Sequence, residues 1–416
     1  MFFIYQILLS ILLVISPIII LLRILKNKED KKRYIEKFSI PTKKRNNGKL
    51  VWFHGASVGE ILSIIPLVNY YENQKKVDQI LITSSTVSSS KVIRKFKFKK
   101  TIHQFFPVDH FFFVNKFLDY WKPNLAIFID SEIWPYMFKR IYNKNISLIL
   151  LNARLTKKTF NRWIKVNFFS KSIFSKIKIA YPQNLETKNY LRKLNIKKIK
   201  HIGNLKFTQN NDINQNKISK KLKLQLKDKK IWVASSTHVS EEIFCAETHV
   251  ELKKKIKNLI TIIIPRHIHR VNEIVAEIKK LNLKIALHSK KPNSLKNIDI
   301  YLVDTFGETQ IFHQIGATVF LGGSIIKRGG QNPLEAARYG ARIVHGPNTD
   351  NFNDVYKLLK KLKVSKKIIT SKQLASSIIF NKNKKIGLKI KNIGEKILKK
   401  TIKELDNLIN NEFEKT

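Results

Sequence analysis

The chain has 416 residues, and its 79 Lys and Arg against 30 Asp and Glu give a formal charge of +49. This length suffices for two domains with full hydrophobic cores, because a domain takes roughly 150 residues. The 43% hydrophobic content excludes a disordered chain, and the single cysteine, Cys245, excludes an intrachain disulfide and a cysteine-based zinc site. The basic excess suits nucleic acid or an anionic membrane. No RNA-binding or zinc-finger pattern occurs, so a nucleic-acid partner is not expected.

The N-terminal segment is strongly apolar. Residues 2–22 carry no charge, and about 20 apolar residues in a helix span a bilayer core. The segment lacks the basic start and the small-residue cleavage site of a signal peptide. Residues 1–25 are therefore predicted to be an uncleaved single-pass anchor, which Pro17 would kink without preventing insertion.

A basic juxtamembrane segment, residues 26–48, follows the anchor. Ten Lys and Arg and three acidic residues lie between positions 23 and 45. By the positive-inside tendency, the rest of the chain is predicted to lie on the cytoplasmic side. The same segment is expected to bind anionic lipid headgroups of the membrane.

Short β-rich runs alternate with helical stretches in the remainder, and most are continuous apolar runs, as in strands buried on both faces. The first series of expected strands is 49–57, 79–86, 101–107, 125–130, 147–153, 178–182 and 200–203. After a polar, Asn-rich stretch at 208–216 the second series is 231–235, 260–265, 284–288, 298–303, 318–322 and 342–345. The alternation predicts an α/β fold of two doubly wound domains, 49–207 and 208–416, joined near 204–216, with packing helices from residue 371 onward.

Ligands of such sheets collect at the carboxyl ends of the strands. The first expected strand ends in Ser57, Gly59 and Glu60, followed by a helical pattern. Ser57 and Glu60 have the spacing of a capping box, which explains both residue types structurally. Gly59 also lets a ligand approach the backbone, and a carboxylate aimed into a cleft from this place suits a general base.

Two further strand ends in the first half carry charged residues. Asp130 and Glu132 follow the fourth run. The structural explanation is that they cap a helix or lie favourably at its N-terminus. The functional explanation is that a carboxylate here orients a sugar or stabilises positive charge. Arg154 follows the fifth run and either clamps a carboxylate or phosphate or simply begins a helix.

In the second half, Ser236, Thr237 and His238 follow a strand at a helix start, where hydroxyls and backbone N–H groups form an anion site. Arg266 follows the next strand and is placed for phosphate or base recognition. His267 and His269 have metal-like spacing, but a third ligand is lacking, so no metal is expected.

The strongest local feature is a glycine-rich loop that includes Gly329 and Gly330 and leads into a helix start. Asn332 as the cap, Pro333 at the first helical position and Glu335 make a well-formed start. Capping does not explain the glycines, which permit a nucleotide phosphate to lie against the backbone. Neither a Walker loop nor a G-x-G-x-x-G pattern occurs, so an ATPase or a Rossmann dehydrogenase is not supported.

Taken together, these motifs resemble the 3-deoxy-D-manno-octulosonic acid (Kdo) transferases of lipopolysaccharide lipid A core biosynthesis. The resemblance runs from the anchor to about residue 354. Its ordered motifs are Ser57-Val58-Gly59-Glu60, Glu132-Ile133-Trp134-Pro135, Asn152-Ala153-Arg154-Leu155, Gly203-Asn204-Leu205-Lys206, Pro265-Arg266-His267, Asp304-Thr305 with Gly307-Glu308, Gly329-Gly330 with Asn332-Pro333-Leu334-Glu335, Gly346-Pro347 and Asn351-Phe352. Each motif is weak alone, but the ordered set is specific.

The resemblance implies a GT-B glycosyltransferase fold in which two Rossmann-like domains face a cleft, the first binding the acceptor and the second the nucleotide sugar. It implies an inverting enzyme of the cell inner membrane that moves Kdo from CMP-Kdo to a lipid A precursor (lipid IVA), without a metal or cofactor. Glu60 would be the proton acceptor, and Asp130 and Lys206 would stabilise the transition state. The implied CMP contacts are Pro265, Arg266, Phe306, Gly307, Glu308, Asn332, Pro333, Leu334 and Glu335. Further expected contacts are Ser57, Gly59, Arg154, Ser236, Thr237, His238, Gly329 and Gly330.

The sequence departs from the family pattern at three positions. Asp130 stands where Glu is more frequent, Phe306 replaces a usual Met, and Gln331 stands where His is common. The shorter Asp130 side chain reaches one methylene less far, and the role of the ring normally found at position 331 is left open.

Two other functions remain open at this stage. One is another GT-B transferase that uses a UDP-sugar and a membrane lipid acceptor. The other is a basic, membrane-tethered protein that binds nucleic acid. The motifs do not encode how many Kdo residues are added, the acyl pattern of the acceptor, the oligomeric state or the extent of domain closure.

Overall fold

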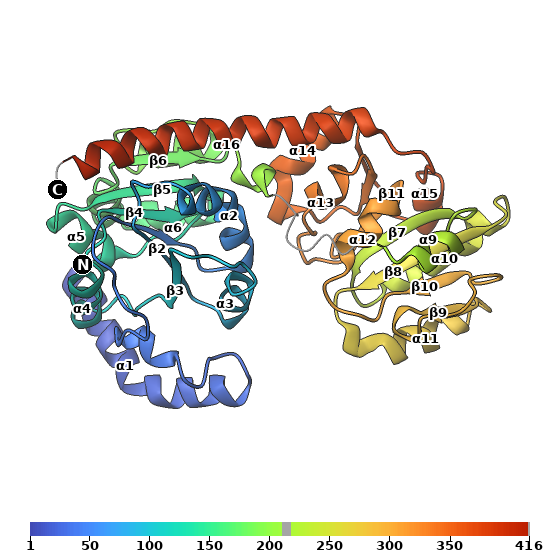
Figure 1. The fold of residues 1–416 in the computed structure, drawn as a ribbon, viewed down its shortest axis with the longest axis horizontal. Coiled ribbons are helices and arrows are strands. Elements are labelled where there is room, and N and C mark those ends of the chain that lie inside the picture. The colour runs from blue at the N-terminus through green and yellow to red at the C-terminus, as the bar shows by residue number, and fades with distance from the viewer. Residues whose placement is uncertain (210–217, 415–416) are drawn as a thin grey trace. The chain divides into compact units, whose positions relative to one another are not determined.

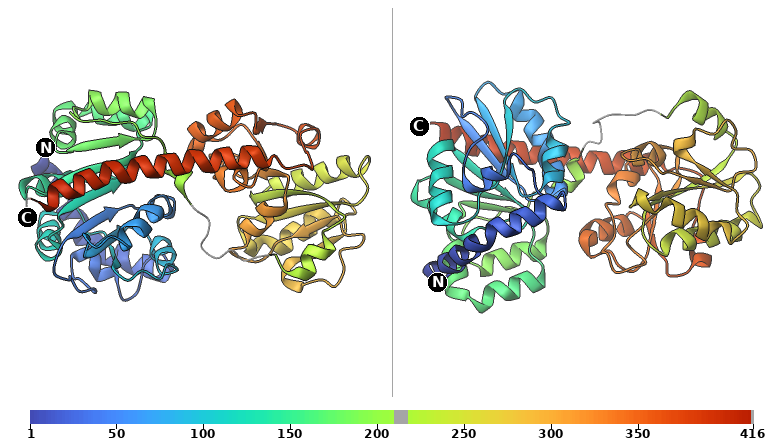
Figure 2. Two further views of the ribbon diagram at one scale, coloured as in Figure 1. Left: turned by 45° about the horizontal axis from the view of Figure 1, so that its top comes forward. Right: turned by 90° about the horizontal axis from the view of Figure 1, so that it is seen from below.

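The computed structural model describes residues 1–209 and 218–414 (Figure 1). The chain divides into two compact units, one made of residues 1–210 with 394–416 and the other of residues 211–393. Each unit is built around its own fully parallel sheet (Figure 2). The expected link at 204–216 falls largely on residues outside the described ranges.

The sheet of the first unit has six strands in the order β3-β2-β1-β4-β5-β6. Its strands are β1 (Leu50–His54), β2 (Gln79–Ser84), β3 (Thr101–Phe105), β4 (Leu125–Ile129), β5 (Ser147–Ala153) and β6 (Ile179–Pro182). Its helices are α2 (Val58–Glu72), α3 (Val87–Ile93), α4 (Phe111–Trp121), α5 (Pro135–Asn143), α6 (Lys157–Lys165), α7 (Asn167–Phe174) and α8 (Leu185–Lys193). The apolar strands β1, β2, β4, β5 and β6 are buried along their whole length, as their composition predicts.

The register of this sheet aligns the strand ends that carry the candidate residues. His54 at the end of β1 pairs with Thr83 of β2 on one side and Phe128 of β4 on the other. The loops that follow β1, β2 and β4 therefore leave the sheet at one edge. The expected strand at 200–203 is not formed, and its neighbour Ile199 makes only an isolated bridge to Ala180.

The sheet of the second unit has seven strands in the order β13-β12-β11-β7-β8-β10-β9. They are β7 (Lys230–Thr237), β8 (Leu259–Pro265), β9 (Ile285–Leu287), β10 (Ile300–Leu302), β11 (Thr318–Leu321), β12 (Arg342–His345) and β13 (Ser365–Lys367). The helices are α9 (Lys220–Gln225), α10 (Glu241–Lys253), α11 (Val271–Lys279), α12 (Thr309–Ile315), α13 (Leu334–Ala337), α14 (Asn353–Lys361) and α15 (Ser371–Ala375). The edge strand β13 is absent from the expected set because its Ser-Lys-Lys sequence has no apolar run.

The last helix, α16 (Lys384–Phe413), is shared between the units. From Gly394 onward it belongs to the first unit, where Asp406 accepts hydrogen bonds from Tyr70 (2.9 Å) and Lys76 (2.8 Å). Gly203 lies so close to Ile397 that a Cβ there would be 2.9 Å from its side chain. The expected second domain runs to residue 416, whereas the structure groups 394–416 with the first unit.

The N-terminal helix α1 (Phe2–Leu25) is long and apolar enough to cross a membrane, with a mean hydropathy of 2.8, and its most apolar window is 0% buried. Its polar side chains contact the residues just before α4: Tyr5 donates to Asp109 Oδ2 (2.8 Å), and Ser10 bonds with His110 (3.1 Å). The remaining sides expose large apolar side chains along the whole helix. A fully spanning orientation would require these hydrogen bonds to open, so the orientation of α1 stays a prediction.

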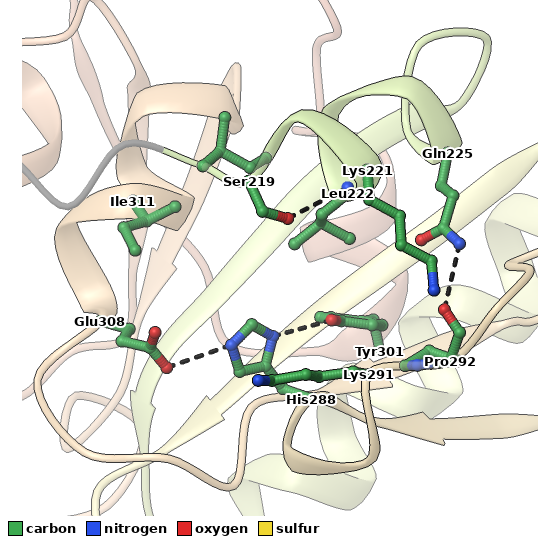
Figure 3. Close-up of a pocket in the computed structure, with 11 residues that line it drawn as sticks. Ser219, Lys221, Leu222, Gln225, His288, Lys291, Pro292, Tyr301, Glu308 and Ile311 are labelled. Carbon is green, nitrogen blue, oxygen red and sulfur yellow. Dashed lines mark hydrogen bonds and ion pairs between the residues drawn. The ribbon is translucent and has the colours of Figure 1, made fainter.

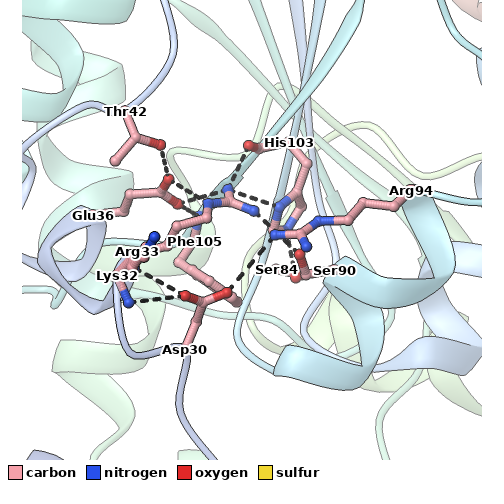
Figure 4. Close-up of polar contacts among 10 residues, drawn as sticks. All are labelled: Asp30, Lys32, Arg33, Glu36, Thr42, Ser84, Ser90, Arg94, His103 and Phe105. Carbon is pink, nitrogen blue, oxygen red and sulfur yellow. Dashed lines mark hydrogen bonds and ion pairs between the residues drawn. The ribbon is translucent and has the colours of Figure 1, made fainter.

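The basic segment after α1 is folded onto the sheet through a buried ion pair (Figure 4). Arg33 bonds both carboxylate oxygens of Glu36, at 2.7 and 2.9 Å, and donates to the His103 carbonyl at 2.7 Å. Glu36 is fully buried and accepts the N–H of Phe105 at 2.7 Å. Residues 33–38 are thereby fixed to the carboxyl end of β3, which the sequence alone did not indicate.

Candidate active site

Glu60 lies in the first turn of α2, directly after β1. Ser57 caps the helix, accepting the Glu60 N–H, and its hydroxyl donates to Glu60 Oε1 at 2.7 Å. Glu60 Oε2 accepts the N–H of Ala56 at 2.7 Å. The capping explanation is therefore correct, and the same hydrogen bonds hold the carboxylate in one orientation.

The environment of Glu60 disfavours its negative charge. The pKa of Glu60 is raised to about 7, mainly by burial. The hydrogen bonds from Ser57 and Ala56 act in the opposite direction, whereas the carboxylates of Glu132 and Asp130 add to the rise. A carboxylate with a pKa near neutrality can take up a proton at physiological pH and release it afterwards. This is the property that a general base requires.

Asp130 follows β4 and adopts a left-handed backbone with φ of 60°, which Asp tolerates better than most residues. Its side chain is buried, which raises the pKa of Asp130, whereas the positive charges of Lys206 and Arg154 lower it. The sequence-predicted residues Glu60, Asp130, Arg154 and Lys206 are thus brought within electrostatic range of one another.

Asn152 holds the loop that carries Lys206 close to Asp130. It has a left-handed φ of 52° at the end of β5, and its Oδ1 accepts the N–H of Leu205 at 2.9 Å. Asn204 then caps the short helix η2 (Leu205–Thr208) by accepting the Lys206 N–H at 2.9 Å. The family motif around Asn204 is therefore a structural device that positions a lysine.

His54 and Glu132 belong to this site: Glu132 was considered together with Asp130 but was given no role, and His54 was not singled out. The Glu132 carboxylate accepts from Trp134 Nε1 at 3.0 Å and lies 3.3 Å from His54 Nε2. The other His54 nitrogen bonds Thr83 Oγ1 at 2.9 Å, and burial lowers the pKa of His54. The neutral imidazole therefore orients Glu132, which in turn helps to raise the pKa of Glu60. The spacing of Glu132 two residues after Asp130 was the available signal, whereas His54 reads as a core residue.

In the second unit, Glu241 lies within the anion site that was expected after β7. Its buried carboxylate accepts four backbone N–H groups: those of His238 (3.0 Å), Gly323 (2.6 Å), Ser324 (3.1 Å) and Ile325 (3.0 Å). The anion site expected from the N–H groups after β7 is consequently filled in part by a carboxylate of the chain itself.

The glycines of the loop after β11 are explained largely by close packing. A Cβ on Gly322 would lie 2.2 Å from the Ser236 carbonyl oxygen, and one on Gly329 would lie 2.6 Å from the Asn351 side chain. Gly329 and Gly330 also have positive φ angles of 81° and 72°. These contacts supply the structural reason for the glycines that capping left unexplained.

The expected helix start after this loop is present but is one turn long. α13 begins at Leu334, one residue after the predicted position, and Asn332 Oδ1 accepts the Leu334 N–H at 3.1 Å. Burial raises the pKa of Glu335, and the nearby Arg338 and Arg266 lower it. Arg266, directly after Pro265 of β8, is exposed and thus free to face a ligand.

Glu308 lies beside a cavity of about 660 Å³ that is bordered by α9, by the loop after β9 and by α12 (Figure 3). His288 Nε2 contacts Glu308 Oε2 at 3.1 Å, and its Nδ1 bonds the Tyr301 hydroxyl at 2.7 Å. The hydroxyl of Thr305 also donates to Glu308. Glu308 is therefore held from two sides, and Phe306 next to it is 83% exposed. The sequence analysis did not single out His288 or Tyr301.

No group of three His, Cys, Asp or Glu side chains that could hold a metal occurs in residues 1–209 and 218–414. His267 and His269 lie with ring centroids 5.6 Å apart and are both exposed. The described side chains thus offer no built metal centre at this strand end.

Comparisons with known proteins place this geometry in context. A family model described as 3-deoxy-D-manno-octulosonic-acid transferase (kdotransferase) matches residues 32–209. The 3-deoxy-D-manno-octulosonic acid transferase of Rickettsia bellii is 33% identical over 95% of this chain and 94% of its own length. The enzyme of the same name from Haemophilus influenzae is 30% identical over 74% of this chain and 73% of its own. A glycosyltransferase structure from Rickettsia africae superposes with a TM-score of 0.54 at 12% identity, covering 88% of this chain and 99% of that chain, a likeness of fold alone.

The two parallel Rossmann-type sheets, each with charged residues at its carboxyl edge, define a protein with the GT-B fold. More narrowly, the chain belongs to the 3-deoxy-D-manno-octulosonic acid transferase family. The expected fold class and enzyme class are confirmed. The roles of single residues stay predictions.

Proposed function

We propose that the protein transfers Kdo from CMP-Kdo to a lipid A precursor with inversion at the anomeric carbon. In this reaction the acceptor hydroxyl oxygen bonds to the anomeric carbon, the bond from that carbon to the CMP phosphate oxygen breaks, and CMP leaves with the electron pair. The hydroxyl proton passes to Glu60. The observation that carries the proposal is the position of Glu60 in the first turn of α2, where Ser57 and Ala56 hold its carboxylate in a site that also contains Asp130 and Lys206. The pKa of Glu60, raised to about 7, suits this role.

The charged neighbours have separate tasks in this proposal. The transition state is oxocarbenium-like, so a buried carboxylate such as Asp130 stabilises positive charge on the sugar. Burial raises the pKa of Asp130, and the positive charges of Lys206 and Arg154 oppose this rise and so favour its ionised form. Pro265, Arg266, Phe306–Glu308 and Asn332–Glu335 are proposed to bind CMP at the carboxyl edge of the second sheet.

The membrane assignment rests on α1 and its surroundings. The exposed apolar side chains of α1 suit lipid, and the basic segment 26–48 suits anionic headgroups. We propose that the enzyme is held at the inner membrane with both units on the cytoplasmic side. A lipid acceptor would then be within reach of an enzyme that is confined to the same surface.

The decisive experiment incubates the purified full chain with CMP-Kdo and tetraacylated lipid A precursor in detergent micelles and resolves the products by mass. Addition of one or more Kdo units to the lipid is the expected result, and the mass also counts the units. A donor panel of CMP- and UDP-sugars separates the proposal from a UDP-sugar transferase. Thermal stabilisation by CMP but not by UMP is the expected companion result, because a ligand stabilises only the folded state to which it binds.

His288 provides a test of the donor contacts. We expect His288→Leu to raise the KM for CMP-Kdo about tenfold with kcat nearly unchanged, because the variant releases Glu308 from one charge-assisted hydrogen bond. Steady-state kinetics measure the effect. In the Glu308→Gln variant, the additional change His288→Leu should raise the KM little further, because the two substitutions remove the same contact. His201→Leu, which removes an exposed imidazole of the first unit, is the control. Additive losses would show that His288 acts elsewhere.

A further inference from the structure

A group of cationic side chains surrounds the loop that follows β11. A Cβ on Gly323 would lie 3.3 Å from Arg328 Cβ and 3.3 Å from His238 Cδ2, so both side chains flank this glycine. The His238 ring lies 5.6 Å from the His267 ring, measured between centroids, and His267 follows Arg266 directly. Three strand ends, those of β7, β8 and β11, thus contribute positive or titratable groups to one place.

These charges are incompletely neutralised by the protein. Arg270, which is buried nearby, pairs with Glu242 at 3.3 Å and with Glu273 at 3.2 Å. Arg266 and Arg328 are exposed, and within residues 1–209 and 218–414 neither forms an ion pair with a carboxylate. The Nε2 atom of His238 has no hydrogen-bond partner in the same part of the chain.

The electrostatic field of this group acts on the histidines within it. Burial lowers the pKa of His238, and the positive charges of His267, Arg328 and Arg266 lower it further. Burial also lowers the pKa of His267, with His269, Arg266 and Arg328 adding to the effect. An anion placed among these side chains would relieve their mutual repulsion.

Backbone groups do not supply the anion binding here. The N–H groups of Gly323, Ser324 and Ile325, which would otherwise face a ligand, are bonded to Glu241. Side chains must therefore neutralise the negative charge of a ligand here, and Arg328 is an exposed arginine that forms no ion pair with a carboxylate among the described residues. Arg266, by contrast, is near enough to Glu335 to lower its pKa.

We propose that Arg328, with His238 beside it, binds the carboxylate of the donor sugar, while Arg266 serves the nucleotide of the same donor. This inference rests on the proposed function. CMP-Kdo carries two separate anions, the phosphodiester and the carboxylate attached to the anomeric carbon. Recognition of the second anion would select ulosonic-acid donors over nucleotide sugars that lack a carboxylate, because an unpaired arginine fork favours a planar carboxylate partner.

The test compares a ligand that lacks the carboxylate with one that carries it. For the full chain and its Arg328→Gln variant, calorimetry gives the Kd of CMP, and kinetics with the lipid acceptor give the KM of CMP-Kdo. We expect Arg328→Gln to raise the KM of CMP-Kdo about 10- to 100-fold and to change the Kd of CMP less than about threefold. Arg328→Lys, which keeps the charge without the fork, should recover part of the loss.

Lys327→Gln is the matched control, because it removes an equal charge from the adjacent exposed position and should leave both constants unchanged. An equal loss for CMP and CMP-Kdo in Arg328→Gln would assign the arginine to the phosphate and overturn the inference, as would no loss for either ligand. A wild-type chain that neither binds CMP nor transfers Kdo would instead contradict the proposed function, before any variant is compared.

Discussion

Replacement of Glu60 by Gln is expected to lower kcat for Kdo transfer by about 10³-fold and to leave the Kd of CMP within about twofold. A sugar hydroxyl is a very weak acid, so its proton must leave while the new bond forms. Gln keeps the size of the side chain and its bond from Ser57 but cannot accept that proton. Product formation from labelled CMP-Kdo and calorimetry with CMP measure the two quantities separately.

The matched control is Glu186→Gln. Glu186 also lies in the first turn of a helix that follows a strand of the same sheet, but it is exposed and bonds only Tyr190 among the described residues. It should retain full activity. Retention of activity by Glu60→Gln would remove the base assignment, and a parallel loss of CMP binding would show that the variant disturbs more than proton transfer.

The pH profile supplies an independent readout of the same residue. Transfer needs the ionised carboxylate, so kcat/KM of the wild type should rise with pH through an apparent pKa of about 7. The stability effect has the opposite sign. Because folding raises the pKa of Glu60, the neutral form stabilises the fold fully below about pH 4.5, and this contribution is lost as the pH rises through about 7. Glu60→Gln should therefore gain thermal stability relative to the wild type between pH 5 and pH 8.

The central strands of both sheets were predictable because burial on both faces leaves a continuous apolar run in the sequence. The exceptions have the opposite composition. β13 is a Ser-Lys-Lys edge strand, defined only by pairing with β12. The segment 200–203, Lys-His-Ile-Gly, forms a loop instead of the expected strand, and its Gly203 packs against Ile397 of α16, nearly two hundred residues away. Contacts of this separation leave no local pattern.

The candidate site was predictable to a similar degree and for a related reason. Glu60 and Asp130 closely follow strand ends, and Glu335 lies at the helix start after a glycine-rich loop. Both kinds of position can be located from the sequence. The histidines that contact the carboxylates of these sites cannot be found in this way. His54 contacts Glu132 from a neighbouring strand, and His288 contacts Glu308 from a different loop. Such pairs become apparent only once the register of parallel strands is known.

The ion pair of Arg33 and Glu36 shows that contacts of residues 26–48 were likewise not predictable from the local sequence. From composition, residues 26–48 were expected to bind anionic lipid headgroups, yet one arginine there bonds a fully buried glutamate and the β3 carbonyl of His103. The segment thereby ties the chain that follows α1 to the sheet edge at which the Glu60 loop also lies. A count of charged residues cannot distinguish a side chain that binds lipid headgroups from one that forms an ion pair inside the fold.

Glu241→Gln is expected to produce the largest loss of stability in the second unit. The carboxylate accepts four N–H groups, three of them in the loop after β11, and it is fully buried. An amide of the same size presents N–H groups where the protein requires an acceptor, so at least one buried donor is left without a partner. The expected cost is about 3 kcal/mol, since hydrogen bonds to a buried charge are worth roughly 1.5–3 kcal/mol each. For a unit of this size that corresponds to a fall in Tm of about 6–12 °C.

Calorimetric melting of the full chain measures this effect, and Glu247→Gln is the control, because Glu247 is an exposed acid of the same helix α10. The loss should be accompanied by weaker CMP binding, because the loop fixed by Glu241 carries Gly323 and leads to Asn332, a proposed CMP contact. If Glu241→Gln melted like the wild type, the loop would be held by its glycine packing alone, and the argument that its N–H groups are closed to a ligand would lose its basis. The Glu241 carboxylate thus stabilises this loop, and it also occupies the backbone N–H groups that could otherwise bind an anion. Side chains are therefore left to bind the anions of the donor.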